Sequence, residues 1–297
     1  MRIVVAGGAG FLGRHVVRRL LEGGDEVTTL DGRPLATQFP GERAVVCDLS
    51  ASAAPAAARA VEEAEGVVWL AATIRQRTRV DETAGEDLEL MVGGPVAFLG
   101  ALARPPRALV YLSSIQVYGA PRRLPVEEEH PTDPITAYGV AKLYAEHVLR
   151  IASGRIGVRF VALRPSFVYG PGQHPGNVIP IFIDAVRRGE PPKIFGTGRE
   201  IRDDVHVDDV ARAIELALRR PAEGTFNVAS GKPHTLLEVA EAICRLGPPG
   251  MRPDIVGGVS GWLDRWFAVD RARSVLGFEP RRGFEEGLRG MWAWEGA

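Results

Sequence analysis

The start of the chain constrains the fold most, because a glycine-rich turn separates two apolar patterns of different period. A short apolar run from Ile3 to Ala6 is typical of a buried strand, and Gly7, Gly10 and Gly13 follow it. The amphipathic stretch from Phe11 to Leu21 has helical spacing. Strand, glycine turn and helix in this order predict a dinucleotide site, in which backbone amides at the helix N-terminus approach a pyrophosphate.

The first half of the chain repeats this alternation of short apolar runs and helical patterns. Such alternation predicts a parallel sheet with helices on both faces. Asp133-Pro134 is an entry signal for a helix, because proline suits the first helical turn. The expected strands cover residues 2–6, 26–30, 44–47, 66–70, 108–112 and 158–163, and the expected helices cover 11–23, 53–64, 84–103 and 135–153.

After Arg164-Pro165 the composition shifts toward proline and glycine, and a substrate-binding part is expected to begin there. The prediction is an α/β fold, a Rossmann-type doubly wound parallel sheet in an NAD-binding domain of residues 1–165. Residues 204–229 read as strand, helix and strand, so the chain is expected to return to this sheet. The remaining parts of 166–297, with helices near 235–246 and 283–294, would form a smaller C-terminal substrate-binding lobe.

The composition and net charge of the chain limit the classes of partner that it is expected to bind. The 297 residues include 45% hydrophobic and 25% charged residues, as in an ordinary soluble globule. A net charge of −1 gives no reason to expect nucleic acid or an anionic membrane as the main partner. No signal peptide and no bilayer-spanning run is apparent, so a cytoplasmic enzyme is expected. Cys47 and Cys244 lack any partner spacing for zinc, and no metal site is expected.

Asp31 ends the second expected strand and bears on the choice of cofactor. A carboxylate there can accept both hydroxyls of an adenosine ribose and would repel a 2′-phosphate, which favours NAD over NADP. Arg33, two residues later, could instead pair with that phosphate. Asp48 and Leu49 follow the third strand and either flank the adenine or act as a helix cap beside a core leucine.

Tyr138 and Lys142 stand one helical turn apart and project from the same face of the expected helix. The ammonium can favour the ionised phenol, whose ordinary pKa is about 10, and can also hydrogen-bond a ribose hydroxyl. A hydroxyl from the pair Ser113-Ser114 can hold the substrate oxygen that gains or loses a proton. These residues predict an acid/base site for hydride transfer.

The ordered motifs resemble the extended short-chain dehydrogenase/reductase family, in particular its NAD-dependent nucleotide-sugar epimerase and dehydratase branch. The resemblance runs through nearly all of the chain. It rests on the glycine turn, Asp31, Asp48-Leu49, Leu70-Ala71-Ala72, the Ser-Ser-Ile-Gln-Val-Tyr-Gly of 113–119, Tyr138 with Lys142, Leu163-Arg164-Pro165, the Val-Tyr-Gly-Pro-Gly of 168–172 and the Arg-Asp-Asp-Val-His-Val-Asp-Asp of 202–209.

The resemblance implies roles for individual residues. The catalytic residues would be Ser114, Tyr138 and Lys142, with Ser113 a structural neighbour. The cofactor site would comprise Gly7, Gly10, Phe11, Leu12, Gly13, Asp31, Arg33, Asp48, Leu49, Leu70, Ala71, Ala72, Tyr138, Lys142 and Pro165. The substrate contacts would come from Thr73, Ser114, Gln116, Phe167, Asn177 and Arg202.

Some of these assignments have plainer alternatives. Arg202 matches the arginine that clamps the substrate diphosphate, whereas by itself an arginine beside Asp203 is more often a surface pair. Asn177 fits a substrate contact or a simple turn former. Arg265 is the nearest candidate for a second diphosphate arginine. His206 reads as structural, since no metal-ligand cluster accompanies it.

Departures from the family pattern narrow the reaction. Dehydratases of this family carry an Asp-Glu pair directly after the active serine or threonine, whereas this chain has Ile115 and Gln116. Neither side chain can move the protons that elimination needs, so dehydration is disfavoured. Trp69, Met91 and Phe167 stand where the family commonly has histidine or asparagine, which affects details of the cofactor site and the substrate pocket.

The leading interpretation is an NAD-dependent nucleotide-sugar epimerase that transfers hydride transiently through a keto-sugar intermediate. The alternative is an NAD(P)H-dependent ketoreductase of nucleotide sugars, such as a deoxysugar enzyme. A third hypothesis, from another class, is a non-catalytic dinucleotide-sensing protein, because fold alone does not fix function. The resemblance also implies a homodimer formed through the helix that bears Tyr138 and its neighbour at 84–103.

Overall fold

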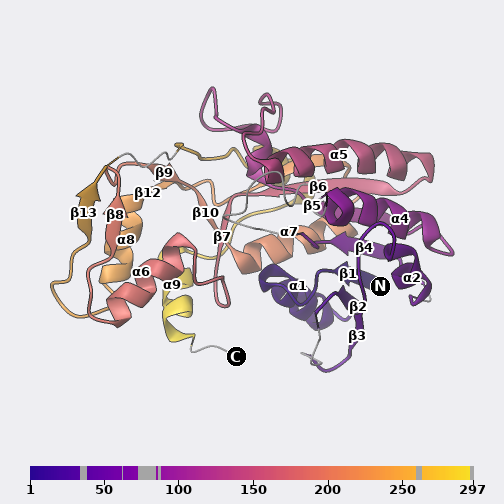
Figure 1. Cartoon of the computed structure of the whole chain (residues 1–297), viewed down its shortest axis with the longest axis horizontal. Coiled ribbons are helices and arrows are strands. Elements are labelled where there is room, and N and C mark those ends of the chain that lie inside the picture. Colours follow the sequence, from indigo (N-terminus) through magenta and orange to yellow (C-terminus); the bar gives the residue numbers. More distant parts are fainter. Residues whose placement is uncertain (34–38, 62, 73–84, 86–87, 259–262, 295–297) are drawn as a thin grey trace.

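The computed structural model describes residues 1–33, 39–61, 63–72, 85, 88–258 and 263–294. Its centre is a seven-stranded parallel sheet with the strand order β11-β6-β5-β4-β1-β2-β3 (Figure 1). The strands are β1 (Arg2–Ala6), β2 (Glu26–Asp31), β3 (Glu42–Val46), β4 (Gly66–Trp69), β5 (Ala108–Leu112), β6 (Arg159–Pro165) and β11 (Gly224–Val228).

The central strands of the sheet are apolar on both faces, as expected of a parallel sheet whose crossover helices cover both sides. All four residues of β4 are buried, and so are the last four of β1, which leaves no polar face for solvent. The strand order reverses between β1 and β4, and in such sheets ligands bind outside the carboxyl ends of the strands at this switch point. The Rossmann-type fold predicted from the sequence is confirmed.

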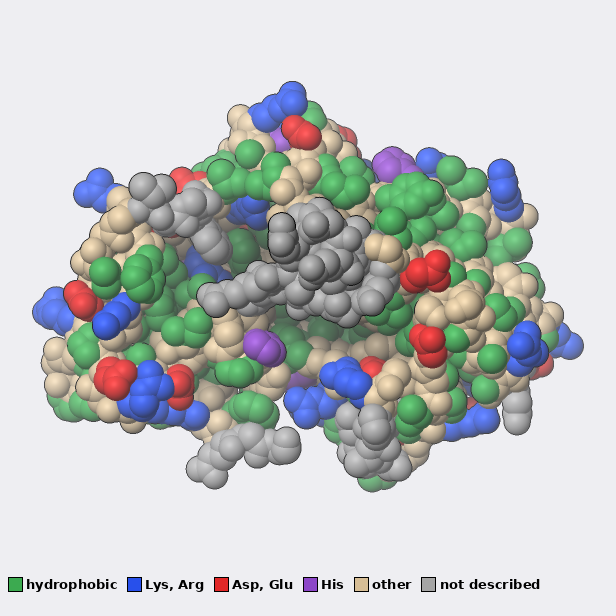
Figure 2. Space-filling model, viewed as in Figure 1, with side chains coloured by type: hydrophobic (Ala, Val, Ile, Leu, Met, Phe, Trp, Pro, Cys, Tyr) green, Lys and Arg blue, Asp and Glu red, His purple; other side chains and the backbone are tan. Residues whose placement is uncertain are grey.

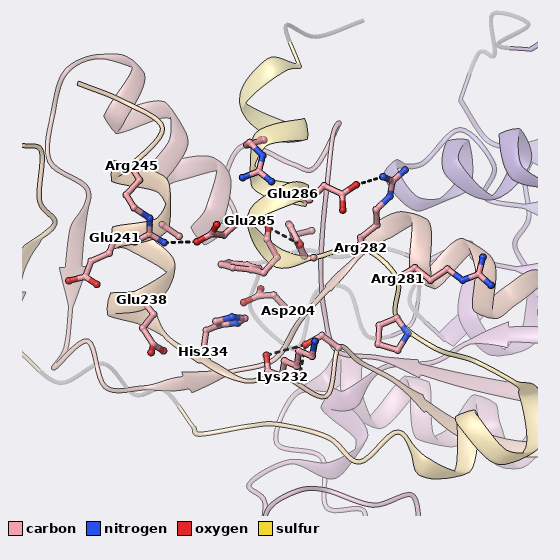
Figure 3. Close-up of a pocket in the computed structure, with 17 residues that line it drawn as sticks. Asp204, Lys232, His234, Glu238, Glu241, Arg245, Arg281, Arg282, Glu285 and Glu286 are labelled. Atoms are coloured by element: carbon pink, nitrogen blue, oxygen red, sulfur yellow. Dashed lines mark hydrogen bonds and ion pairs between the residues drawn. The ribbon is translucent and has the colours of Figure 1, made fainter. Parts of the chain in front are cut away.

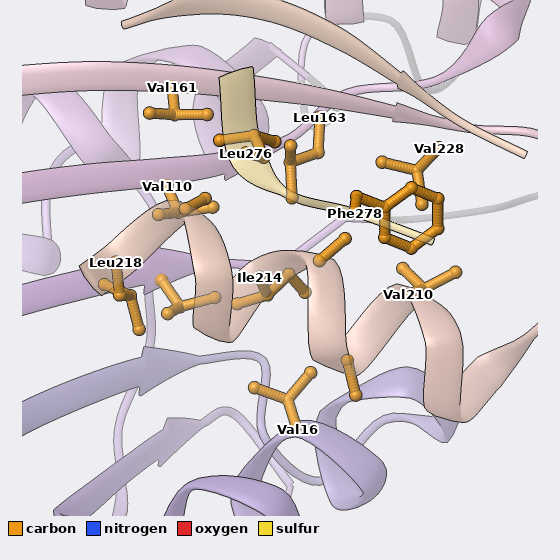
Figure 4. Close-up of a cluster of buried hydrophobic side chains, with 14 of the residues drawn as sticks. Val16, Val110, Val161, Leu163, Val210, Ile214, Leu218, Val228, Leu276 and Phe278 are labelled. Carbon is orange, nitrogen blue, oxygen red and sulfur yellow. The ribbon is translucent and has the colours of Figure 1, made fainter. Parts of the chain in front are cut away.

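Helices cover both faces of the sheet. α1 (Phe11–Glu22) and α7 (Val207–Arg219) pack on one face, where Val16 and Ile214 belong to the same buried cluster (Figure 4). α2 (Ala54–Arg59), α4 (Gly94–Ala101) and α5 (Ala137–Arg155) cover the other face through residues such as Phe98 and Leu149. Successive strand residues serve opposite clusters, as the two-residue period of a strand requires.

A second, smaller group of elements lies beside the sheet (Figure 1). α6 (Val178–Arg187), α8 (Leu236–Cys244) and α9 (Phe284–Ala293) share a buried cluster that includes Phe182, Ile243 and Leu288. Three two-stranded sheets accompany them: β7 (Phe167–Tyr169) with β10 (Asp204–His206), β9 (Ile201–Arg202) with β12 (His234–Thr235), and β8 (Lys193–Phe195) with β13 (Asp254–Gly257).

Two helices differ from the ranges that hydrophobic periodicity predicts. α2 is much shorter than the predicted 53–64, because the apolar Val61 and Ala64 that extended the pattern are buried in the connection to β4. The described part of the predicted helix 84–103 is a π-helical turn (Glu89–Gly93) followed by α4. Pro95 lies in the first turn of α4 and has no N–H to continue the preceding ladder.

The surface carries charge of both signs. On the face drawn in Figure 2, Lys and Arg side chains lie among Asp and Glu side chains, in keeping with the net charge of −1. None of the helices in the described ranges is both long and apolar enough to cross a bilayer.

A buried ion pair joins α5 to two central strands. Arg164, on β6, donates from Nε and Nη2 to the two carboxylate oxygens of Glu146 on α5, at 2.9 and 2.6 Å. Their side chains are only 6% and 7% exposed. Ser113, directly after β5, donates its hydroxyl to the same carboxylate. Arg164 therefore fixes the position of α5 against the carboxyl ends of β5 and β6.

The pair continues into a buried hydrogen-bond chain. Arg164 Nη1 donates to the hydroxyl oxygen of Tyr118 at 2.9 Å, and this hydroxyl donates to Asn227 Oδ1 at 2.7 Å. Burial raises the pKa of Tyr118 to about 12, so it remains a donor. Burial alone would lower the pKa of Arg164, but hydrogen bonds and the charge of Glu146 raise it above its ordinary value. Arg164, Tyr118 and Asn227 thus each have a hydrogen-bond partner inside the core.

We predict that Glu146→Gln lowers the free energy of unfolding by about 3 kcal/mol or more, because a buried guanidinium then loses its counter-ion. Urea denaturation measures this. The control is Glu127→Gln, which breaks the exposed pair between Glu127 and Arg123 and should cost less than about 1 kcal/mol. Equal, small losses in both variants would contradict the anchoring role of the buried pair.

Candidate active site

One cavity collects most of the residues predicted to bind the cofactor. It has a volume of about 460 Å³. The predicted residues that line it are Gly7, Gly10, Asp31, Arg33, Asp48, Leu49, Leu70, Ala71 and Ala72. These residues lie at or just after the carboxyl ends of neighbouring strands, which explains why distant motifs meet there.

The sequence analysis missed two residues that line this cavity, Gly32 and Leu90. Gly32 stands between Asp31 and Arg33, so its neighbours in sequence were a sufficient signal. Leu90 belongs to the π-helical turn before α4, and its place followed from no motif. One wall of the cavity is thus formed by a π-helical turn, which hydrophobic periodicity in the sequence does not reveal.

The glycine turn is shaped for close backbone approach. Gly7 has a φ of +87°, and a Cβ there would lie 2.6 Å from the backbone nitrogen of Ala71. A Cβ on Gly13 would lie 2.4 Å from the carbonyl oxygen of Gly7. Phe11 and Leu12 begin α1, so the first helical amides face the turn. Phe11 lines a neighbouring cavity of about 550 Å³ rather than the first one.

Asp31 is held by its neighbours at the end of β2. The backbone nitrogen of Ala9 donates to Oδ2 at 3.0 Å, and Arg33 donates from Nε and Nη2 at 3.1 Å each. The hydrogen bond with Asp31 raises the pKa of Arg33. Arg33 is thus folded back on Asp31, and a ribose hydroxyl reaching this carboxylate has to share it with the guanidinium.

Asp48 and Leu49 both line the cavity, while the alternative of a helix cap is wrong. The N-cap residue of α2 is Ala53, and Asp48 instead accepts from the backbone nitrogen and hydroxyl of Ser50 at 2.8 and 2.9 Å. Leu49 is 4% exposed and also belongs to the core. Asp48 therefore makes a local turn beside the cavity.

Trp69 and Met91, two of the departures from the family pattern, are completely buried. The Trp69 ring meets Phe98 of α4 edge to face, with ring centroids 5.7 Å apart. Neither residue lines the cofactor cavity. Their large side chains fill the core below α4, so these two changes alter packing beneath the site.

The face of α5 that bears Tyr138 and Lys142 points at the end of β5. Lys142 is 1% exposed, and its Nζ donates to the carbonyl oxygen of Leu112 at 2.7 Å. The same Nζ lies 5.6 Å from the centroid of the Tyr138 ring and 4.7 Å from that of Tyr111. The helix begins later than predicted, since the hydroxyl of Thr136 caps it by accepting from Gly139 N at 3.0 Å. Tyr138 thus lies in its first turn.

Ser114 and Gln116 lie opposite this helix start. Ser114 is 8% exposed, and its hydroxyl oxygen accepts from the backbone nitrogen of Gln116 at 3.2 Å. Gln116 Oε1 accepts from the Thr136 hydroxyl at 2.7 Å. The Ser114 proton is therefore available to a substrate oxygen, whereas Ser113 is committed to Glu146, as expected of a structural neighbour. Pro165 ends β6 at the same edge of the sheet.

On the predicted substrate side, Arg202 is buried and not a surface partner of Asp203. It donates from Nε and Nη2 to both oxygens of Asp204, at 2.6 and 2.7 Å. Its guanidinium also lies 5.0 Å from the centroid of the Phe167 ring. Asn177 occupies the N-cap position of α6, without a capping hydrogen bond from its side chain.

The remaining candidates are placed as follows. Arg265 donates from its backbone nitrogen to Ile201, beside Arg202, and from Nη2 to the carbonyl of Gly119 at 3.0 Å. Burial lowers the pKa of Arg265. His206 accepts from Asp208 N at 3.2 Å as the N-cap of α7, and burial lowers its pKa, which agrees with a structural role. Thr73 lies outside the described residues.

A further cavity of about 600 Å³ lies between α8, α9 and the segment 280–283 (Figure 3). Charged side chains on its wall pair with one another, as in Arg245 with Glu285 at 2.8 Å and Arg282 with Glu286. None of the described residues predicted from the sequence to form the site lines it. The predicted chemistry therefore belongs to the carboxyl edge of the large sheet. No described group of three His, Cys, Asp or Glu side chains could hold a metal ion.

Known proteins resemble this chain over almost its whole length. A putative UDP-glucose 4-epimerase of Methanocaldococcus jannaschii is 31% identical, covering 98% of this chain and 97% of its own. A dTDP-glucose 4,6-dehydratase of Streptomyces niveus is also 31% identical, covering 97% and 90%. The solved structure of MoeE5 in complex with UDP-glucose and NAD is similar with a TM-score of 0.86 and 32% identity, covering 99% and 98%.

The family itself follows from a match over most of the chain. A sequence model described as the NAD dependent epimerase/dehydratase family matches residues 3–229, from β1 to the residue after β11. The match includes the glycine turn, both serines and the Tyr138 helix. The cofactor expected from Asp31, NAD, agrees with this description. The chain therefore belongs to the NAD dependent epimerase/dehydratase family, as an enzyme of the extended short-chain dehydrogenase/reductase type.

Proposed function

We propose that this enzyme is an NAD-dependent nucleotide-sugar epimerase that works by transient hydride transfer through a keto-sugar intermediate. The observation that carries the proposal is the placement of Tyr138, Lys142 and Ser114 together at the sheet edge that also bears the cofactor cavity. The relatives named UDP-glucose 4-epimerase support it.

The residues around the cavity fit NAD. The tight turn at Gly7 and Gly13 leaves backbone amides accessible to a pyrophosphate, and Asp31 supplies acceptors for ribose hydroxyls. A bound nicotinamide ring supplies a reversible hydride acceptor. Among the described residues that line the cavity, the cation is Arg33, and Asp31 already engages it, which disfavours a 2′-phosphate.

The proton chemistry falls to the protein. Tyr138 would take the proton of the sugar hydroxyl as the carbon beneath it loses hydride, and would return the proton when hydride comes back to the other face. Lys142 keeps a positive charge close to the phenol in a buried site, where that charge is weakly screened. Ser114 would donate its hydrogen bond to the oxygen that becomes the ketone.

Elimination of water is not part of the proposal, although a relative is named as a dehydratase. Ile115 is 3% exposed and packs in an apolar cluster. The side-chain amide oxygen of Gln116 accepts a hydrogen bond from the Thr136 hydroxyl. Without a carboxyl group at either position, no acid/base pair stands next to Ser114 for expelling a sugar hydroxyl.

For the substrate, we propose a nucleoside-diphosphate sugar lying between the sheet edge and the smaller group of helices. Arg202 would hold the diphosphate, with Phe167 below its guanidinium. Gln116 and Asn177 would contact the sugar and the nucleotide half, and Thr73 stays a prediction.

We predict that Tyr138→Phe reduces epimerase turnover by about 10³-fold or more, because the phenol is the acid and base of both half-reactions. NAD binding, measured by calorimetry, should persist. Tyr144→Phe is the matched control, since Tyr144 lies on the same helix and is 54% exposed. Full activity of the Tyr138 variant would end the mechanism.

A redox-neutral epimerase should retain its cofactor between half-reactions. We therefore predict that protein purified without added nucleotide, then denatured, releases close to one NAD per chain, measured by chromatography and absorbance. Empty protein that oxidises added NADPH with a keto sugar would establish the ketoreductase instead. Absence of any hydride exchange with a panel of nucleotide sugars would favour a dinucleotide-sensing protein.

We also propose that the enzyme is a homodimer that packs α5 against its counterpart. Val140, Tyr144 and Ile151 form an apolar stripe on α5 and are 51%, 54% and 48% exposed. Hydrophobic side chains gather over this helix in Figure 2. A helix with such an exposed stripe needs a partner surface, and burying it gains about 25 cal/mol per Å².

We predict that Tyr144→Glu converts the dimer to a monomer at micromolar concentration, because a charge would be buried without a partner. Sedimentation or light scattering measures the mass. Phe195→Glu is the control, since Phe195 is 65% exposed but lies on β8, away from α5. A wild-type chain that is already a monomer would contradict the proposal.

A further inference from the structure

The arginine expected to clamp the diphosphate already holds a carboxylate. Asp204 accepts from two N–H groups of Arg202 along one edge of the guanidinium, at 2.6 and 2.7 Å. This is the bidentate geometry with which arginine also binds phosphate. Asp204 has a side chain with no exposed surface, and that of Arg202 is 7% exposed. The pair is therefore close, buried and weakly screened.

Two roles for such a carboxylate have opposite consequences for an anionic ligand. It could orient the guanidinium and so strengthen binding, or it could cancel its charge and occupy its edge, and so weaken binding. Orientation has other sources here, because Arg202 is buried and stacks on the Phe167 ring at 5.0 Å. The main contribution left to Asp204 is its negative charge.

The two neighbouring carboxylates of this segment are used differently. Asp203 lies between β9 and β10 and accepts from Ser230 N and Oγ at 2.8 and 2.6 Å. Asp204 instead reaches the wall of the charged cavity beside His234 (Figure 3). Asp204, the first residue of β10, lies on the same side of this extended segment as Arg202, the last residue of β9, because side chains two residues apart in an extended chain point the same way.

We propose that Asp204 is a specificity-determining residue that acts through Arg202: its carboxylate competes with the substrate's diphosphate for the guanidinium and holds the affinity for the nucleoside-diphosphate half low. The inference rests on the proposed function of Arg202. A consequence is that the enzyme binds a free nucleoside diphosphate less tightly than an unpaired arginine would allow, so selectivity falls more on the sugar and the base.

The test compares UDP with uridine, which lacks the diphosphate. Calorimetry on the NAD-saturated protein should show that Asp204→Asn tightens UDP by about tenfold or more, given the coupling measured for close charge pairs. Uridine binding should stay unchanged, which a merely structural effect would not produce. Unchanged or weaker UDP binding would overturn the inference, and equal changes for both ligands would overturn it too.

Asp203→Asn is the matched control, because it removes the buried carboxylate of the adjacent residue, which accepts from the backbone nitrogens of Ser230 and Gly231. Its ratio of UDP to uridine affinity should match the wild type. Asp204→Ser removes the same charge as Asp204→Asn with a smaller side chain and serves if the asparagine variant does not fold.

Arg202→Met separates failure of this inference from failure of the proposed site. If Arg202→Met leaves UDP binding unchanged in both the wild-type and Asp204→Asn backgrounds, Arg202 is not the clamp. If Arg202→Met weakens UDP binding but Asp204→Asn does not tighten it, the clamp stands and the competition is wrong. The inference expects the loss from Arg202→Met to be larger in the Asp204→Asn background.

Discussion

The ion pair between Glu146 and Arg164 is the constraint on which the geometry of the active site depends. Tyr138, Lys142 and Glu146 follow one another at four-residue intervals, so they share one face of α5. Glu146 is tied to β6 through Arg164 and to the end of β5 through Ser113, while Lys142 is tied to Leu112. A rotation of the helix would break all of these contacts together.

The two halves of the site use different means to bind charge. On the cofactor side, the turn at Gly7 and Gly13 offers backbone groups, which are fixed and carry no net charge. On the proposed substrate side, Arg202 carries a full charge that Asp204 already balances. Backbone amides bind a phosphate group without reorganisation, whereas the positive charge of a paired arginine is already balanced in part by its carboxylate. Retention of cofactor and release of product would follow naturally from this difference.

Much of the fold was readable because its signals are local. The predicted strands 2–6 and 108–112 match β1 and β5, and the glycine turn, Asp31 and Leu70-Ala71-Ala72 meet in one cavity as parallel strands require. Other features depend on tertiary contacts. The π-helical turn with Leu90, the short α2 and the folding back of Arg33 on Asp31 have no periodic signature.

The ion pair of Arg202 depends on both local sequence and tertiary burial. Adjacency in sequence drew attention to Asp203, yet the two-residue period of an extended chain pairs Arg202 with Asp204. Burial decided the matter, because an arginine that is 7% exposed must have a counter-ion within reach. Considering strand geometry before sequence adjacency would have identified the pair.

The burial of Lys142 affects how the folded protein reacts with amine-directed reagents. The chain contains only three lysines, Lys142, Lys193 and Lys232. Lys193 and Lys232 are exposed and lie in the part of the protein away from α5, whereas Lys142 is 1% exposed. Amine-reactive reagents therefore modify Lys193 and Lys232 in the folded protein, while the ammonium of Lys142 stays shielded.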